Sequence, residues 1–280
     1  MALRIWHQSM APLGEFGSYA ACLEKHAAAV IDEGTEVVLH GAAPGSYAGR
    51  PPATVLAHSY ARLVITQQVI GQVRQAEREG YDAVALATFG APFLTECRSL
   101  VDIPVVSMAQ VALLTAGNLA TRPAVVALSA GAVPRMRALL RGVSLGAEIV
   151  VVGLRPAVTE VEIIAALDGA DDGVAASFEQ AAGEAAAAGA DLVIPGEGAL
   201  NELLYQRGVR QAGGLGVLDP FAVVLAWTEM LVMLRRRTGL STSHAGGYSR
   251  PDDDLLAALD RADSRPEVPA SDPARDRGTK

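Results

Sequence analysis

Two short apolar runs that stop at small residues constrain most strongly what this chain can fold into. The first, AVALA at residues 83–87, ends in TFGAP, and the second, VI at residues 193–194, ends in PGEG. Each run is followed by a helix-like segment, a pattern typical of buried parallel strands. The turn after such a strand lies at the carboxyl end of the sheet, where open α/β folds bind their ligands. We therefore expect a site built from two facing halves, with Thr88 and Glu197 at its tips.

Strand-like and helix-like segments alternate along most of the chain, and this order implies parallel sheets with helices on both faces. The same order of elements occurs in both halves. The expected strands are residues 3–6, 36–40, 83–87, 105–107, 124–128, 148–153, 192–195 and 216–218. The expected helices are residues 19–33, 55–79, 93–101, 133–141, 160–188 with a break near 169–173, 200–207 and 219–237.

Composition narrows the classes of partner. The formal net charge is −8, and nucleic acid is an unexpected partner because phosphate neutralisation needs a basic face. No apolar run is long enough for a bilayer span, and the first residues, MALRIWHQSM, do not have the pattern of a signal peptide. Two cysteines far apart in the sequence fit a reducing compartment. We expect a cytoplasmic protein without a membrane partner.

The chain resembles the aspartate/glutamate/hydantoin racemase superfamily, and most closely its hydantoin-racemase-like branch. The blocks that carry the resemblance are GYDAVALATFGAPFL with VDIPVVSMAQVALL, then ADLVIPGEGALNELL, then LGVLDPFAVVLAWTEML, and it covers roughly residues 3–237. It implies an α/β fold of two similar domains, each with a four-stranded parallel sheet flanked by helices, and an active site in the interdomain cleft. It also implies catalysis without cofactor or metal, and a homodimer or higher homo-oligomer.

Domain boundaries follow from the same arrangement. We expect a first α/β domain at residues 1–115 plus 219–262, which includes the closing helix. The second α/β domain covers residues 116–218. The last residues, 263–280, are rich in Pro, Asp, Arg and Ser, and we expect a disordered tail there.

The sequence departs from the family pattern at both strand ends. Well-known members of the superfamily carry one cysteine in each half, at these two strand ends, and the two thiols exchange protons with the substrate carbon from opposite sides. By motif position, Thr88 replaces the first cysteine and Glu197 the second. Cys97 lies nine residues beyond Thr88 in a helix-like run, and Cys22 lies on the first expected helix. We interpret both as packed thiols.

Glu197 is the candidate base. A glutamate with an ordinary pKa of about 4.3 is a weak base, but burial between apolar walls would raise that pKa. A helix that begins near Ala199 would act in the opposite direction. The alternative is a structural carboxylate in a first helical turn. Thr88 cannot accept a proton in place of a thiolate. It is expected to hydrogen-bond a substrate carboxylate or hold a water, or else to cap the next helix.

Further candidates for substrate binding lie at the other strand ends and in the same two turns. They are His7, Gln8 and Ser9 after the first strand, Phe89 and Gly90 beside Thr88, Ser129 after the first strand of the second half, and Gly196 and Gly198 beside Glu197. His7 could act as an acid or base, or lie buried at its strand end. His244 belongs to a Ser/Gly-rich segment that either folds over the cleft or connects elements.

The leading hypothesis is a cofactor-independent racemase or isomerase. It would transfer a proton at the carbon next to a carboxylate or carbonyl of a small amino acid, hydantoin, amide or cyclic imide, with Glu197 as the base. A lyase, decarboxylase or hydrolase with an enolate-like intermediate is the close alternative, since one base suits such reactions well. A protein that binds a small ligand without turnover is the second alternative.

Overall fold

The computed structural model describes residues 2–90, 93–143, 148–170 and 173–263. Its first sheet has four strands, all parallel, in the order β2 (Thr35–His40), β1 (Leu3–Gln8), β3 (Ala83–Leu86) and β4 (Val105–Ser107). The carboxyl ends of β1 and β3 lie side by side, because Gln8 pairs with Leu86. The turns that follow these two strands are therefore neighbours.

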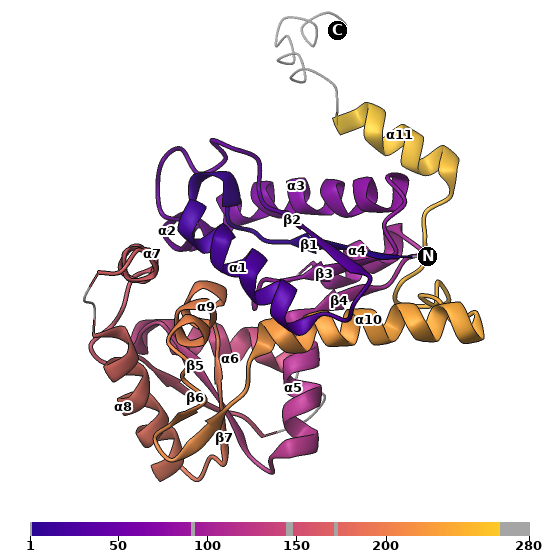
Figure 1. Ribbon diagram of the computed structural model, residues 1–280. Helices are drawn as coiled ribbons and strands as arrows, with labels where there is room; N and C mark the ends of the chain where they lie inside the picture. The colour runs from indigo at the N-terminus through magenta and orange to yellow at the C-terminus, as the bar shows by residue number, and fades with distance from the viewer. Residues whose placement is uncertain (1, 91–92, 144–147, 171–172, 264–280) are drawn as a thin grey trace, which may run out of the picture.

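Helices cover both faces of the first sheet (Figure 1). Alternate side chains of a strand point to opposite faces. Trp6, Val84 and Leu86 pack with α3 (Ser59–Arg78) and α4 (Leu94–Leu100). Ile5 and Ala85 belong to the core on the other face, which includes residues of α1 (Gly17–Val30) and α10 (Pro220–Thr238). Two short helices, η1 (Leu13–Glu15) and α2 (Pro52–Leu56), lie in the connections of this half.

The second sheet has four parallel strands in the order β6 (Val150–Gly153), β5 (Pro123–Ala127), β7 (Leu192–Pro195) and β9 (Leu215–Val217). A two-residue strand, β8 (Gln211–Ala212), adds an antiparallel edge beside β9. Its helices are α5 (Met108–Leu119), α6 (Val133–Arg141), α7 (Glu160–Leu167), α8 (Val174–Ala187) and α9 (Gly198–Gln206), with the short η2 (Ala130–Ala132) before α6. The expected α/β fold with two helix-flanked parallel sheets is confirmed.

One hydrophobic core joins the two halves. It runs without a break from Ile5 and Leu23 of the first half to Val125 and Ile194 of the second. The helix α10 lies between the sheets: it contacts β3 and β4 on one side and α5 on the other (Figure 1). Such a shared core holds the two sets of strand ends in a fixed relation to each other.

The structure adds elements that the sequence pattern did not indicate. α5 follows β4 directly, and the Ser107 side chain caps it by accepting from the Gln110 N–H group at 3.5 Å. α11 (Asp253–Asp263) contacts α3 through the Arg74–Asp260 ion pair. Asp263, where we expected the tail to begin, is helical, and the rest of that expected tail lies outside the described residues. Within the described ranges, no helix is both long and apolar enough to cross a membrane.

Candidate functional site

The turns after β3 and β7 meet at the boundary between the two halves. Gly198, the first residue of α9, lies against the Tyr19 hydroxyl and near the Ala87 carbonyl oxygen. A Cβ atom added at Gly198 would lie 2.7 Å from the Tyr19 Oη atom and 3.8 Å from the Ala87 oxygen. Only a residue without a side chain fits there. The arrangement brings the turns that carry Thr88 and Glu197 together, as the sequence predicted from the two strand ends.

Glu197 has the geometry of a helix cap and the pKa of a base that works near neutral pH. Its backbone is extended (φ −151°, ψ 140°), and its Oε2 atom accepts from the Leu200 N–H group at 2.8 Å. Burial and then the charge of Glu160 raise its pKa to about 7, against the lowering effect of the α9 backbone N–H groups. Part of the residue stays accessible to solvent. The carboxylate therefore has the structural capping role, and its raised pKa is compatible with the role of a base.

The surroundings of Glu197 are acidic and aromatic. Burial raises the pKa of Glu160, whose Oε2 atom accepts from the Ala53 N–H group at 2.9 Å. Burial, with the nearby charges of Glu197, Glu202 and Glu160, raises the pKa of Tyr19 well above its usual value. Tyr47 is buried and donates to the Met10 carbonyl oxygen at 2.6 Å, and its pKa is raised by burial and by Glu160. No Lys or Arg contributes to these four shifts within the described residues.

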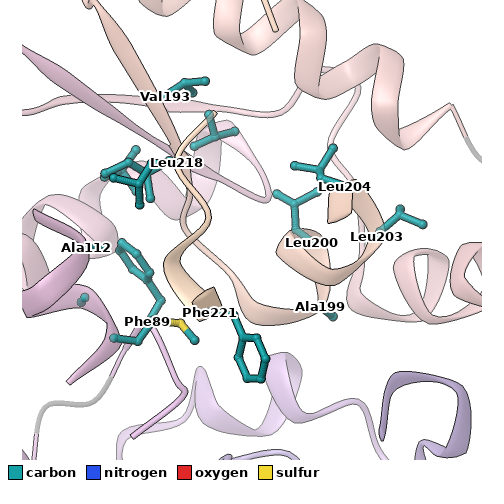
Figure 2. Close-up of a cluster of buried hydrophobic side chains, with 14 of the residues drawn as sticks. Phe89, Ala112, Val193, Ala199, Leu200, Leu203, Leu204, Leu218 and Phe221 are labelled. Carbon is teal, nitrogen blue, oxygen red and sulfur yellow. The ribbon is translucent and has the colours of Figure 1, made fainter. Parts of the chain in front are cut away.

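Thr88 serves a different purpose from Glu197. It is half-buried, and its Oγ1 atom accepts from the Met10 N–H group at 3.1 Å, which ties the end of β3 to the loop after β1. It does not cap the next helix, since α4 begins at Leu94 after Phe93. Two of its neighbours in the turn, Phe89 and Gly90, are packed against the second half. Phe89 is buried in the shared core (Figure 2), and a Cβ atom at Gly90 would lie 3.3 Å from Leu139 of α6.

His7 is a fully buried side chain on the face of β1 toward α10. Its ring meets the ring of Phe221 edge-on, with centroids 5.7 Å apart, and within the described residues neither ring nitrogen has a hydrogen-bond partner. Burial and then the proximity of His40 lower its pKa to about 3. His7 is therefore neutral at physiological pH. This arrangement agrees with the alternative that His7 lies buried at its strand end.

The remaining polar candidates are engaged in internal hydrogen bonds. The Gln8 side chain accepts from the Trp6 indole N–H group at 2.7 Å and donates to Gln72 at 2.9 Å on the side of α3. The Ser9 Oγ atom accepts from the Ala11 N–H group at 3.0 Å. Ser129 caps η2, where its Oγ atom accepts from a backbone N–H group at 3.2 Å. These four bonds hold the residues at the strand ends in place.

Gly196 is required by close packing. A Cβ atom there would lie 2.8 Å from side-chain atoms of Met136 and Val125 and 2.9 Å from the Val126 carbonyl oxygen. The turn therefore has no room for a larger residue on this side, and the path of the chain toward Glu197 is fixed.

Neither cysteine is placed to act as a base. Both are buried, and burial raises the pKa of each thiol to about 12, with Glu202 as a further cause at Cys22. The expectation that they are packed thiols is confirmed. His244 lies on the segment after α10, where its Nε2 atom is 2.8 Å from the Asp102 Oδ1 atom, a contact that fits a connector.

Sequence reasoning missed Tyr19, Tyr47 and Glu160. They lie on α1, on the loop before α2 and at the start of α7. Only the tertiary fold brings Tyr19 and Glu160 toward Glu197, and Tyr47 toward Glu160. A local signal existed for the start of α7, because Thr159 and Glu162 form a capping box. That signal locates a helix end and says nothing of which residue lies opposite it.

The fold and the site together define a class of α/β protein with two helix-flanked sheets. At the carboxyl end of one strand, β7, it carries the Glu197 carboxyl group, whose pKa lies near neutrality. The model of the Asp/Glu/hydantoin racemase family matches residues 17–227, and the chain belongs to this family. The expected family is thereby confirmed, and the match covers both turns of the site.

Solved structures share the fold across most of the chain. Allantoin racemase from Klebsiella pneumoniae is 23% identical with a TM-score of 0.69, and the match covers 90% of this chain and 95% of that one. Allantoin racemase from Pseudomonas fluorescens is 23% identical with a TM-score of 0.66, covering 89% and 97%. An arylmalonate decarboxylase variant is 17% identical with a TM-score of 0.53, covering 82% and 93%. No curated protein matches the sequence.

Proposed function

We propose that this member of the racemase family transfers a proton at the carbon next to a carbonyl group of a small molecule, with Glu197 as the base. The observation that carries the proposal is the pKa of Glu197, about 7, at the carboxyl end of β7. A base is most effective when its pKa lies near the working pH. Neither metal nor organic cofactor is part of the proposed reaction. A cytoplasmic homodimer or higher oligomer, expected from the sequence, stays part of the same proposal.

The charge around Glu197 favours a neutral substrate. Glu160 already raises the pKa of Glu197 by repulsion, and a substrate carboxylate would add a further negative charge. Among the described residues, no Arg or Lys contributes to the pKa shifts of Glu197, Tyr19 or Tyr47, so no basic side chain offsets this negative charge there. We therefore favour an amide or cyclic imide, such as a hydantoin, over an amino acid or another free carboxylate.

The proposed step balances within the site. The Glu197 carboxylate takes the proton from the carbon, and the electron pair of the C–H bond moves onto the carbonyl oxygen to give an enolate-like anion. Hydrogen-bond donors stabilise such an anion, and the Tyr19 hydroxyl lies beside Gly198 where it can donate one. The raised pKa of Tyr19 keeps that donor protonated. Return of the proton to the carbon completes the exchange.

A single base supports a second candidate function. Racemisation needs proton delivery to both faces of the carbon, whereas Thr88 accepts a bond from Met10 and is no base. In a decarboxylase or another lyase, one residue protonates the anion after bond cleavage. The resemblance in fold to an arylmalonate decarboxylase is compatible with this candidate. Binding without turnover is the outcome if no reaction is found.

A proton-exchange screen in deuterated water tests the proposal. Hydantoins, succinimides, amino acids, malonates and hydroxy acids are incubated with wild type, Glu197→Gln and the control Glu33→Gln, whose glutamate is exposed. Deuterium uptake with an unchanged skeleton, lost only in Glu197→Gln, is the expected result. Loss of carbon dioxide or addition of water points to the lyase or hydrolase reading. Equal uptake in wild type and Glu197→Gln contradicts the role of Glu197.

A further inference from the structure

A second cluster of titratable side chains lies where α1, α9 and the start of α10 meet. On α1 it includes Cys22 and His26, and on α9 it includes Asn201 and Glu202. The fifth member is Asp219, the cap of α10. His26 and Glu202 are fully buried, and one quarter of the Asp219 side chain is exposed. The cluster therefore joins the first half to the two helices that begin at the second sheet.

His26 contacts both carboxylates of the cluster. Its Nδ1 atom lies 3.1 Å from Oε1 and 3.0 Å from Oε2 of Glu202. Its Nε2 atom lies 3.0 Å from Oδ2 of Asp219, an ion-pair contact outside the angular range of a hydrogen bond. The ring stacks on Tyr205 of α9, with centroids 3.4 Å apart and planes 7° from parallel, and it also contacts Phe221. The ring nitrogens of His26 thus contact two acidic side chains, and the faces of the ring pack against aromatic rings.

Asn201 completes the arrangement by bridging the two acids. Its Nδ2 atom donates to Oε1 of Glu202 at 3.1 Å and to Oδ1 of Asp219 at 3.0 Å. The Cys22 thiol is a weaker donor to Glu202, with its Sγ atom 3.6 Å from Oε2. These bonds leave two carboxylates close together in a buried place, an arrangement that is costly unless a cation neutralises them.

The protonated form of His26 supplies that cation. Burial opposes its charge, yet the contacts with Asp219 and Glu202 raise its pKa to about 9. Burial likewise acts to raise the pKa of Asp219, but His26 holds it below the usual value. At neutral pH His26 is an imidazolium between the side chains of Glu202 and Asp219.

Complementary faces of α1 and α9 connect this cluster to Glu197. Tyr19, Cys22 and His26 share one face of α1, since they are three and four residues apart. Gly198, Glu202 and Tyr205 share one face of α9 at similar spacing. Tyr19 touches Gly198 at one end, and His26 stacks on Tyr205 at the other. Glu197 caps the same short helix, so any displacement of α9 along α1 moves its carboxylate.

We propose that His26 is a positioning residue, whose imidazolium ties Glu202 of α9 and Asp219 of α10 to the first half and thereby fixes Glu197 against Tyr19 and the β3 turn. This inference rests on the proposed function of Glu197. The titratable groups that face His26 are Glu202 and Tyr205 from α9 and Asp219 from the start of α10. Cys22 lies one turn away on α1, and His7 of β1 lies across Phe221.

The experiment follows the Glu197 carboxyl group directly in the full chain. Glutamate labelled with carbon-13 at Cδ is incorporated, and the Glu197 signal is identified by its absence in Glu197→Gln. In His26→Gln, weaker packing of α9 against α1 lets water reach the Glu197 carboxyl group. We expect the titration midpoint of Glu197 to fall by about one pH unit or more. Glu202→Gln, which keeps a hydrogen-bond acceptor for His26, should shift the midpoint in the same direction by less. It also serves if His26→Gln does not fold.

His40→Gln is the matched control, because His40 is a half-buried histidine stacked on Trp6 at 3.2 Å and away from α9. It should lower the Tm without moving the Glu197 midpoint. An unchanged midpoint in both His26→Gln and Glu202→Gln, with only a lower Tm, would overturn the positioning role. A wild-type midpoint near 4.5 would instead refute the proposed base. Hydrogen exchange of the Leu200 N–H group, which bonds Glu197, then decides for His26: faster exchange in His26→Gln supports the role and equal exchange refutes it.

Discussion

The two strand ends of this molecule occupy matching positions and have different chemistry. After β3, Thr88 uses its hydroxyl oxygen to hold the Met10 N–H group, and it has no proton-accepting group. After β7, Glu197 caps α9 and has a pKa raised to about 7 by burial and Glu160. One end is thus a structural tie and the other a candidate base. A fold that places two turns face to face does not require two equivalent catalytic groups.

The largest expected effect tests the difference between the two strand ends. Glu197→Gln keeps the shape and an acceptor for the Leu200 N–H group but removes the base, so we expect the exchange rate to fall by about 10²–10⁴-fold. Thr88→Val removes an acceptor and no base, so we expect a loss of about tenfold or less, through misplacement of the turn. Deuterium incorporation into the substrate identified by the screen measures both. Equal losses would mean that the two strand ends are catalytically equivalent.

The ionised side chain of Glu197, the candidate base, should also lower the stability of the folded protein. Its pKa is raised from 4.5 to about 7, so the folded state binds the proton more tightly than the unfolded state does. Stability is therefore lost as the pH rises from about 4.5 through 7. At pH 8, we expect Glu197→Gln to raise the free energy of unfolding by about 1–3 kcal/mol, a range reduced for the partial exposure of the residue.

Urea unfolding at pH 8 and pH 4 checks this sign. The gain should shrink at pH 4, where wild-type Glu197 is protonated in both states. Thr88→Val should instead lower stability by about 1 kcal/mol at both pH values, because the Met10 N–H group loses its partner. A destabilised Glu197→Gln at pH 8 would mean that its capping bond outweighs the buried charge.

The close approach of Tyr19 to Gly198 offers a steric test of the contact between the two halves. Gly198→Ala would place a methyl group 2.7 Å from the Tyr19 hydroxyl, so the two helices must separate. We expect a cost of about 1–3 kcal/mol in unfolding free energy and slower proton exchange. Gly183→Ala in α8 is the matched control, since its Cβ atom meets nothing within 4 Å. It should stabilise the helix by about 0.5–1 kcal/mol and leave exchange unchanged.

The smallest expected effect concerns the second carboxylate. Glu160→Gln removes one of the two causes that raise the pKa of Glu197. The pH profile of kcat/KM should rise with the ionisation of Glu197, and in Glu160→Gln this rise should move to lower pH by about half a unit to one unit. A profile that does not move would show that burial alone sets the pKa.

The alternation of apolar strands and helices predicted the fold because parallel strands buried on both faces leave a clear signal, as VAL at residues 84–86 and VVAL at 125–128 do. α5 was missed because it follows β4 without a turn and is mostly apolar, so that residues 105–116 show no change of periodicity. α11 was missed because it is a mostly exposed surface helix between polar segments.

The site could be predicted only in part. Strand-end position indicated Thr88 and Glu197 as candidates, because the order of local elements places both residues directly after a strand. Tyr19, Glu160 and His26 could not be found in this way, since each meets α9 or Glu197 only through the packing of distant helices. The direction of the Glu197 pKa shift was also open, because the sequence shows the helix start but not the burial that outweighs it.

The most direct test of the account is the titration of Glu197 in the wild-type protein without ligand. Carbon-13 NMR of the labelled carboxyl group follows its protonation between pH 3 and pH 9. We predict a midpoint near 7, which would make Glu197 at the end of β7 a base suited to neutral pH. A midpoint near 4.5 would show that the capping bonds of α9 outweigh burial, and Glu197 would then not be a base suited to neutral pH.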